Sequence, residues 1–113
     1  MAVARVRTIQ YQPGHDEEIV ALYRDEIVPA AAEQPGLLQY LLLNDPESGK
    51  VLSITLWEDE SVVPPGDPPR YVAGLAGRLG ELRDPGAGTP PQEMFDVRVN
   101  FQQSRETSDR RDL

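Results

Sequence analysis

The sequence contains no cysteine and only one histidine, His15. The absence of cysteine excludes disulfides, iron–sulfur clusters and thiol catalysis. A single histidine also excludes a metal site built from several histidines of one subunit. We therefore expect no metal and no cofactor. His15 itself stands beside a turn at the start of a predicted helix, where we expect a solvated capping or surface residue.

Basic charge is scarce as well. Eleven basic residues stand against 19 acidic ones, and the formal net charge is −8. Such a chain repels phosphate backbones, so no nucleic acid partner is expected. No apolar run approaches the roughly 18 residues of a membrane span, so no membrane partner is expected either. Residues 1–10 lack the apolar core of a signal peptide, which predicts a cytoplasmic protein.

Four segments have the composition of strands. Residues 3–11 are rich in β-formers, and residues 37–44 and 51–58 flank a turn that begins with Asp45-Pro46 and ends with Gly49-Lys50. These two runs and their turn predict an antiparallel hairpin. In residues 95–101, apolar and polar side chains alternate, which predicts the last strand.

Two further segments have helical spacing. Acidic residues 16–18 are typical of a first helical turn, and Pro29 predicts that this helix kinks or ends near Val28. Residues 62–69 contain four prolines and predict a stiff loop. A second helix should begin near Arg70 on the apolar stripe Val72, Leu75, Leu79 and Leu82.

The order strand, helix, strand, strand, helix, strand predicts an α+β, ferredoxin-like βαββαβ fold with an antiparallel four-stranded sheet. We assign it to residues 1–101 and expect a polar C-terminal tail over residues 102–113. Residues 37–43 are apolar on both faces of their strand, although helices cover only one face of such a sheet. We therefore predict a homodimer with sheet packed on sheet, a dimeric α/β barrel.

Three features together give a family resemblance: Tyr11-Gln12-Pro13-Gly14 before an acidic helix start, Pro35-Gly36 before a strand, and the block SITLWEDE at residues 53–60. In this order they resemble the antibiotic biosynthesis monooxygenase family over about residues 3–101. The resemblance implies a dimer with a pocket between sheet and helices in each subunit. It also implies relatives that include cofactor-independent oxygenases of phenols and quinols and haem-degrading enzymes.

The chain departs from the family in two places. The haem-degrading branch has an iron-binding histidine on its second helix and an asparagine in its first strand. Residues 70–83 contain no histidine, and Arg7 stands in the first strand, which argues against haem degradation. Most relatives run directly from the tryptophan block into the second helix. Here residues 62–69 intervene, so we expect an altered pocket mouth.

Trp57 is the leading site candidate. Strand parity places it on one face with Ser53 and Thr55, a mixture that suits a pocket for an aromatic ligand. The resemblance also places this tryptophan in the pocket. The alternative is a structural tryptophan packed against a helix.

Other candidates are weaker. Arg7 is a candidate for stabilising an oxyanion, or else an exposed strand residue. Tyr71 is a candidate hydrogen-bond donor over the pocket, or else a packing residue. Asn44, at a strand end, is a polar candidate for substrate binding. Gly77, which recurs with Gly74 and Gly80 at every third residue, is a candidate for making room for a ligand.

We therefore predict a cofactor-independent monooxygenase that acts on a small phenolic, quinol or polycyclic aromatic substrate with O₂. Its catalytic candidates are Trp57, Arg7 and Tyr71, and its substrate-binding candidates are Ser53, Thr55, Asn44 and Gly77. Two alternatives stay open. One is a binding or accessory protein that uses the same pocket without catalysis, and the other is a cofactor-free isomerase or cyclase that needs only proton transfer.

Overall fold

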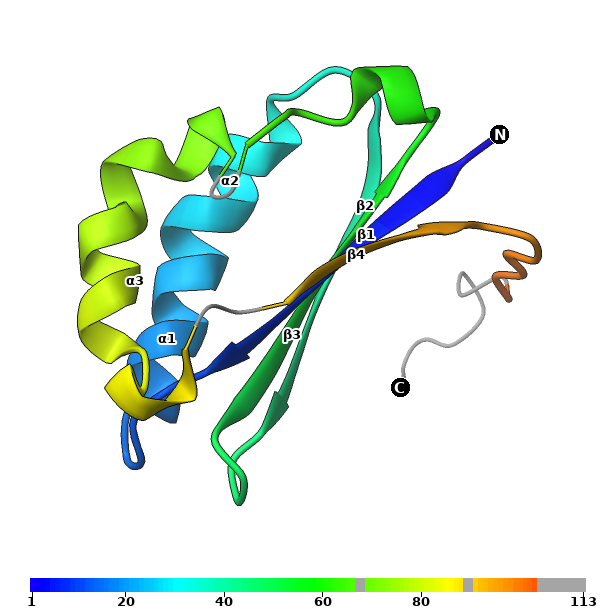
Figure 1. Cartoon of the computed structure of the whole chain (residues 1–113). Helices are drawn as coiled ribbons and strands as arrows, with labels where there is room; N and C mark the ends of the chain where they lie inside the picture. The colour runs from blue at the N-terminus through cyan, green and yellow to red at the C-terminus, as the bar shows by residue number, and fades with distance from the viewer. Residues whose placement is uncertain (67–68, 89–90, 104–113) are drawn as a thin grey trace, which may run out of the picture.

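A computed structural model describes residues 1–66, 69–88 and 91–103 of the chain. Its sheet has the strand order β2-β3-β1-β4, and every neighbouring pair is antiparallel. The strands are β1 (Val3–Gln10), β2 (Leu37–Asp45), β3 (Lys50–Trp57) and β4 (Gln92–Asp96). Figure 1 shows the helices on one side of this sheet only. The predicted ferredoxin-like α+β fold is confirmed.

The first helical segment is interrupted as its proline predicts. It consists of α1 (Asp16–Leu22), a π-helical turn (Tyr23–Ile27) and α2 (Val28–Ala32). Pro29 has no N–H to give to the carbonyl of Asp25, and its ring crowds that carbonyl in a regular helix. A π-turn just before Pro29 changes the hydrogen-bond register there. The helix therefore continues to Ala32 instead of ending near Val28.

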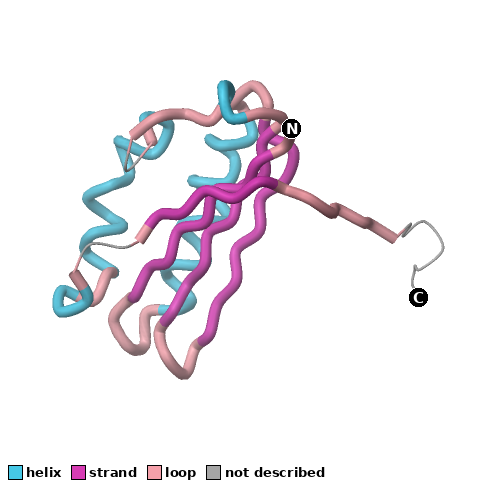
Figure 2. Tube along the Cα trace, turned by 45° about the vertical axis from the view of Figure 1, so that its right-hand side comes forward, coloured by secondary structure: helices cyan, strands magenta, loops and turns pink. Residues whose placement is uncertain are grey.

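The second helical segment is less regular than expected. Arg70–Leu75 forms a 3₁₀-helix, and only Ala76–Leu82 is α-helical (α3). Two shorter 3₁₀ turns occupy Glu60–Val62 and Pro85–Ala87. The core lies between these helices and the sheet (Figure 2). It is built from apolar side chains of both layers, among them Ile9, Ile19, Leu22, Ile27, Val51, Val72 and Leu79.

The last strand differs from its prediction. The alternation at residues 95–101 predicted a strand there, whereas β4 ends at Asp96. The reason is the partner strand: β4 pairs with β1 from Arg7 to Val3, and only the Val97 N–H, which donates to the Ala2 carbonyl, extends the pairing. Beyond Val97 the described residues, up to 103, form no further strand. Val99 and Phe101 consequently remain 86% and 81% exposed.

The segment after β4 lies on the side of the sheet opposite the helices (Figure 1). Within it, the Gln102 side-chain amide donates to Gln39 of β2 at 3.3 Å. Most of the predicted polar tail, from residue 104 on, lies outside the described residues, as do residues 67–68 of the proline-rich loop. In the described part of the chain, no helix is both long and apolar enough to cross a membrane.

Candidate functional site

A small cavity lies between the sheet and the helical layer. Its volume is about 30 Å³, which is space on the order of one or two water molecules. Apolar side chains of the helical layer close one side, namely Ile27, Val72 and Leu79. The polar part of the lining is formed by Arg5, Arg7, Tyr23, Tyr40, Ser53, Thr55 and Tyr71.

The register of the sheet explains why these polar residues meet. Arg5 pairs with Thr55 and Arg7 with Ser53 across β1 and β3, and Tyr40 of β2 pairs with Thr55 from the other side. Directly opposed residues of neighbouring strands project from the same face. Alternate residues on three adjacent strands therefore bring the arginines, hydroxyls and one phenol under the helices.

Arg5 is the most buried charged residue of the cavity, with 6% of its surface exposed. Its Nη1 donates to the carbonyl oxygen of Pro64 at 2.7 Å. Its Nη2 is buried and has no partner at ordinary hydrogen-bond geometry within the described part of the chain. The Tyr71 hydroxyl is nonetheless near enough to the guanidinium for a hydrogen bond that opposes the rise in the pKa of that phenol. A buried N–H without an acceptor is costly. Arg5 thus offers a donor to a further acceptor in the cavity.

The phenols around the cavity are held in their neutral form. Burial raises the pKa of Tyr40 to about 12, against the opposing effect of its hydrogen bond with Ser53 Oγ at 2.7 Å. Burial also raises the pKa of Tyr23 and of Tyr71, and nearby arginines oppose the shift in both. These three hydroxyls are therefore hydrogen-bonding groups rather than bases at neutral pH.

The electrostatics of the cavity are opposite in sign to those of the chain. The protein carries a formal charge of −8, yet the described lining includes two guanidiniums and no carboxylate. Two cations in a partly dehydrated site favour an anion strongly. Among the described residues there is no cluster of three or more histidine or acidic side chains that would hold a metal ion. The arrangement is suited to holding an anionic oxygen.

The predicted residues Ser53, Thr55, Arg7 and Tyr71 line this cavity, whereas Trp57 does not. Trp57 is on the predicted face but stands at the end of β3, beside Leu37 and Val3. It is fully buried there, and its indole N–H donates to Thr55 Oγ1 at 2.8 Å. The structure therefore places it behind the cavity wall, in the packing position of the alternative interpretation.

Asn44 and Gly77 are not part of the cavity, contrary to expectation. Asn44 Oδ1 accepts a hydrogen bond from the buried Tyr11 hydroxyl at 2.9 Å, near the hairpin turn. Gly77 is exposed, and a Cβ added there, or at Gly74 or Gly80, would meet nothing within 4 Å. These glycines face open space, so they neither make room for a ligand nor allow a close backbone contact.

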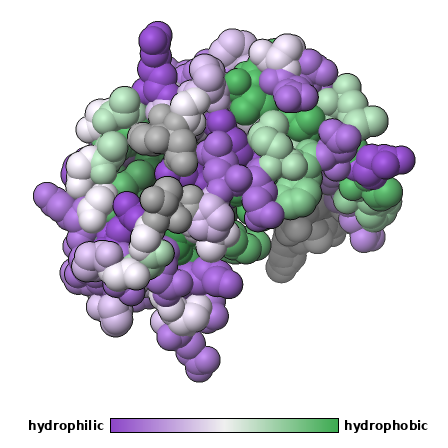
Figure 3. Space-filling view, viewed as in Figure 1, coloured by the Kyte–Doolittle hydropathy of each residue, from purple (hydrophilic) through white to green (hydrophobic). Residues whose placement is uncertain are grey.

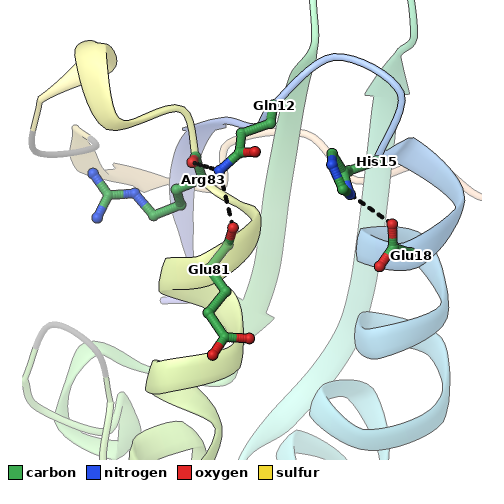
Figure 4. A network of polar contacts seen from close by, with 5 residues as sticks. All are labelled: Gln12, His15, Glu18, Glu81 and Arg83. Carbon is green, nitrogen blue, oxygen red and sulfur yellow. Dashed lines mark hydrogen bonds and ion pairs between the residues drawn. The ribbon is translucent and has the colours of Figure 1, made fainter.

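The Tyr11-Gln12 segment has a structural role instead. The Gln12 side-chain amide donates to the carbonyls of Glu81 and Arg83, each at 3.0 Å, and so binds carbonyls at the end of α3 (Figure 4). His15 Nδ1 lies 2.6 Å from Glu18 Oε1 in the same view, at the start of α1 and without a side-chain cap on the helix backbone. His15 is thus the partly exposed surface residue that the sequence predicts.

Sequence reasoning missed Arg5, Tyr23 and Tyr40. A signal for Arg5 was present, because it is two residues from Arg7 and must share its face of the strand. The sequence gives no signal for Tyr40, which stands in the apolar run of residues 37–43, or for Tyr23, which follows Leu22 in the first helical segment. Their hydroxyls become functional candidates only when the register brings them to the arginines.

A groove of about 900 Å³ opens on the surface next to this cavity. Tyr71 lines both hollows and therefore forms part of the wall between them. Pro64 lines the groove as well, while its carbonyl oxygen binds Arg5 of the inner cavity. Residues 61–66 thus connect the groove to the arginine.

The sequence profile of the antibiotic biosynthesis monooxygenase family matches residues 2–64, more than half of the chain. The protein belongs to the antibiotic biosynthesis monooxygenase family. Among curated proteins, none matches the chain significantly. The family resemblance predicted from the sequence is confirmed.

Several solved structures share the fold. SnoaB of Streptomyces nogalater, a cofactor-independent oxygenase solved as a point mutant, is 19% identical with a TM-score of 0.62, covering 90% of this chain and 98% of its own. The monooxygenase from the ActVA-Orf6 gene of Streptomyces coelicolor, solved with the ligand nanaomycin D, is 20% identical with a TM-score of 0.63, covering 91% and 92%. Rv0793 of Mycobacterium tuberculosis is 14% identical with a TM-score of 0.67, covering 90% and 100%.

Proposed function

We propose that this protein is a cofactor-independent monooxygenase that oxidises a small phenolic, quinol or polycyclic aromatic substrate with O₂. Membership of the family supports the reaction class. The observation that carries the substrate class is the pair of guanidiniums, Arg5 and Arg7, in a cavity whose described lining has no carboxylate. Such a pair stabilises a phenolate, which is the form of a phenol that gives electrons to O₂.

The proposed reaction balances without a metal or flavin. The phenol loses its proton to solvent, and the phenolate passes one electron to O₂, giving a phenoxyl radical and superoxide. The two radicals join at a ring carbon that bears hydrogen, and protonation yields a hydroperoxide. Loss of water from this hydroperoxide leaves a quinone carbonyl. One oxygen atom of O₂ enters the product and the other leaves as water.

In this proposal each residue of the cavity has a distinct role. Arg5 and Arg7 hold the phenolate oxygen, and Tyr71 donates a hydrogen bond to a second oxygen of the substrate. Ser53, bonded to Tyr40, and Thr55 form the polar floor. Trp57 acts through its hydrogen bond to Thr55 and is therefore a positioning residue. Because the cavity has only about 30 Å³, binding requires Tyr71, which separates it from the groove lined by residues 62–66, to move outward.

The test is oxygen uptake with a panel of quinols and naphthols, under air and under anaerobic conditions. We expect O₂ consumption and quinone formation in a ratio of one to one. Arg7→Met should lower the rate by about tenfold or more, because it removes a charge-assisted contact to the phenolate. Arg24→Met is the matched control, since Arg24 pairs with the neighbouring Asp25 on the surface.

A non-catalytic binding protein is the second candidate. It is favoured by one observation: the described lining contains no histidine or carboxylate that would serve as a general base. Tight binding of the same phenols with no O₂ uptake and no product would support this function. Turnover that is independent of oxygen would instead support an isomerase or cyclase.

We further propose that the protein is a homodimer. The open face of the sheet carries Leu41, Leu43 and Phe95, all exposed in the single chain, and the half-buried Leu52, Ile54 and Leu56 lie between them. Hydrophobic side chains also reach the surface on the right of the space-filling view, where Figure 1 draws the segment after β4 (Figure 3). A second copy that packs its sheet against this face would cover these side chains.

A further inference from the structure

The contact between Arg5 and Pro64 links the charge of the cavity to its closure. Arg5 lies on β1 and lines the cavity, and Pro64 belongs to the proline-rich segment that lines the groove. Their hydrogen bond, 2.7 Å long, joins residues that are 59 positions apart in the chain. It ties the segment that lines the surface groove to the buried guanidinium of the cavity.

Arg5 has more donors than this contact uses. Nη1 binds the Pro64 carbonyl, while the buried Nη2 has no partner at ordinary hydrogen-bond geometry within the described part of the chain, and a neutral phenol, that of Tyr71, is the group near the guanidinium. A neutral carbonyl is a weaker acceptor for a guanidinium than a carboxylate or phenolate, and a carboxylate binds two N–H groups at once. An anion in the cavity would therefore satisfy Nη2 and compete with Pro64 for Nη1.

The groove supplies the space that such a ligand needs. At about 900 Å³ it is far larger than the inner cavity of about 30 Å³, and Tyr71 stands between the two. A flat aromatic acid has an apolar ring system for the groove and a charged group for Arg5. Neutral aromatics offer no acceptor strong enough to displace the Pro64 carbonyl.

We propose that Arg5 is the specificity-determining residue for an aromatic anion, and that its bond to Pro64 keeps the cavity closed until the anionic group of the ligand takes over the guanidinium. The proposal rests on the proposed function only in placing the ligand in this cavity. It requires no oxygen chemistry. Arg5 selects by charge, and releasing Pro64 frees residues 62–66 to move away from Tyr71.

The experiment compares two isosteric probes, 2-naphthoate and its neutral amide 2-naphthamide, by calorimetry under anaerobic conditions. Wild-type protein should bind the naphthoate about tenfold or more tightly than the amide. The naphthoate affinity should also fall with added NaCl, whereas the amide affinity should not. Equal affinity for the two probes, or binding of neither, would overturn the proposal.

The decisive variant is Arg5→Met, which keeps much of the length of the side chain and removes every donor. If Arg5 both selects the anion and holds Pro64, the naphthoate should bind about tenfold more weakly and the amide several-fold more tightly, because the cavity is no longer held closed. A purely structural arginine would weaken both probes together, and that result would refute the proposal. Arg78→Met is the control, since Arg78 pairs with Glu26 on the surface.

Two further measurements keep the outcome interpretable. Circular dichroism and urea unfolding establish that Arg5→Met is folded. Should it not fold, Arg5→Lys retains the charge without the planar fork, and the ratio of naphthoate to amide affinity should then fall below that of the wild type. Oxygen uptake with quinols is measured separately. If naphthoate binds selectively but no O₂ is consumed, this proposal stands and the monooxygenase proposal is refuted. If O₂ is consumed and Arg5→Met does not change the rate, the monooxygenase proposal stands and this one is refuted.

Discussion

The indole N–H of Trp57 donates to Thr55 Oγ1 at 2.8 Å, and Thr55 lines the cavity while Trp57 does not. The tryptophan is fully buried, so a ligand in the cavity would touch the threonine first. Strand parity put both residues on one face, and the hydrogen bond joins them along that face. Through this contact the tryptophan fixes the rotamer of a cavity residue.

Trp57→Phe should therefore act mainly on stability. It removes a buried hydrogen bond and part of a packed ring, which together should lower the free energy of unfolding by about 2–3 kcal/mol. Urea unfolding at about pH 7 measures this loss. Thr55→Val should lower stability by about 1–2 kcal/mol, because it leaves the indole N–H buried without its acceptor. If Trp57→Phe abolished ligand binding with unchanged stability, the residue would be a ligand-stacking group instead.

Two glycines should respond to alanine in opposite ways. Gly77 lies in α3 with open space where a Cβ would be, so Gly77→Ala should stabilise the protein by about 0.5–1 kcal/mol. Gly36 has φ +89°, and its added Cβ would lie 2.9 Å from Val62 Cβ. Gly36→Ala should therefore destabilise by about 1–3 kcal/mol. The urea midpoints of both variants provide the test. If both midpoints shifted in the same direction from that of the wild type, the result would contradict the structure.

Most of the fold follows from local patterns in the sequence. Alternation, turn residues and the acidic helix start place three of the strands and the start of the first helix close to their observed bounds. Pro29 also predicts the irregularity of that helix, since its missing N–H is a local property. The last strand could not be predicted in this way, because its bounds depend on its register with β1, a strand that is distant in the sequence.

The candidate site was predictable only in part. Parity along β3 identifies Ser53 and Thr55, and the structure brings them into one cavity with Arg7, the predicted cation of the first strand. Parity does not tell which part of a face the helices leave hollow. Trp57 was a candidate for the cavity because it shares this face and because the family resemblance places it there, with a packing residue as the alternative. The contact between Arg5 and Pro64 depends on the path of a proline-rich segment, for which no sequence period exists.

Alkaline pH should destabilise the protein through its buried phenols. Burial raises the pKa of Tyr40 from 10.0 to about 12, so the folded state keeps a proton that the unfolded state loses. The stabilisation is complete below about pH 10 and disappears as pH rises from 10 towards 12. The slope is on the order of 1 kcal/mol per pH unit for one tyrosine.

Urea unfolding at about pH 9, 10 and 11 measures this slope. Tyr40→Phe should flatten it, while costing about 1 kcal/mol near neutral pH through the lost hydrogen bond with Ser53. The pKa of Tyr23 is also raised by burial, so the double variant with Tyr23→Phe should be flatter still. A slope that is unchanged in both variants would show that other groups cause the alkaline loss.

The open face of the sheet should determine the oligomeric state. Leu41→Glu combined with Leu43→Glu places two charges on the exposed apolar surface of β2, where a partner sheet would have to bury them. Sedimentation at micromolar concentration should show a wild-type dimer and a monomeric variant. Ala73→Glu, which adds charge to an exposed position in the helical layer, should remain dimeric.

The segment after β4 should contribute to the same dimer. Val99 and Phe101 are almost fully exposed on the side of the open face. Burial of an apolar side chain of this size contributes about 1.5–3 kcal/mol of favourable free energy. Val99→Ser combined with Phe101→Ser should therefore weaken dimerisation without lowering the stability of the isolated subunit. The stability of the isolated subunit can be measured in the background of the monomeric double glutamate variant of β2. A wild-type chain that sediments as a monomer would refute both assignments, and an unchanged dimer in the serine variant would refute the second alone.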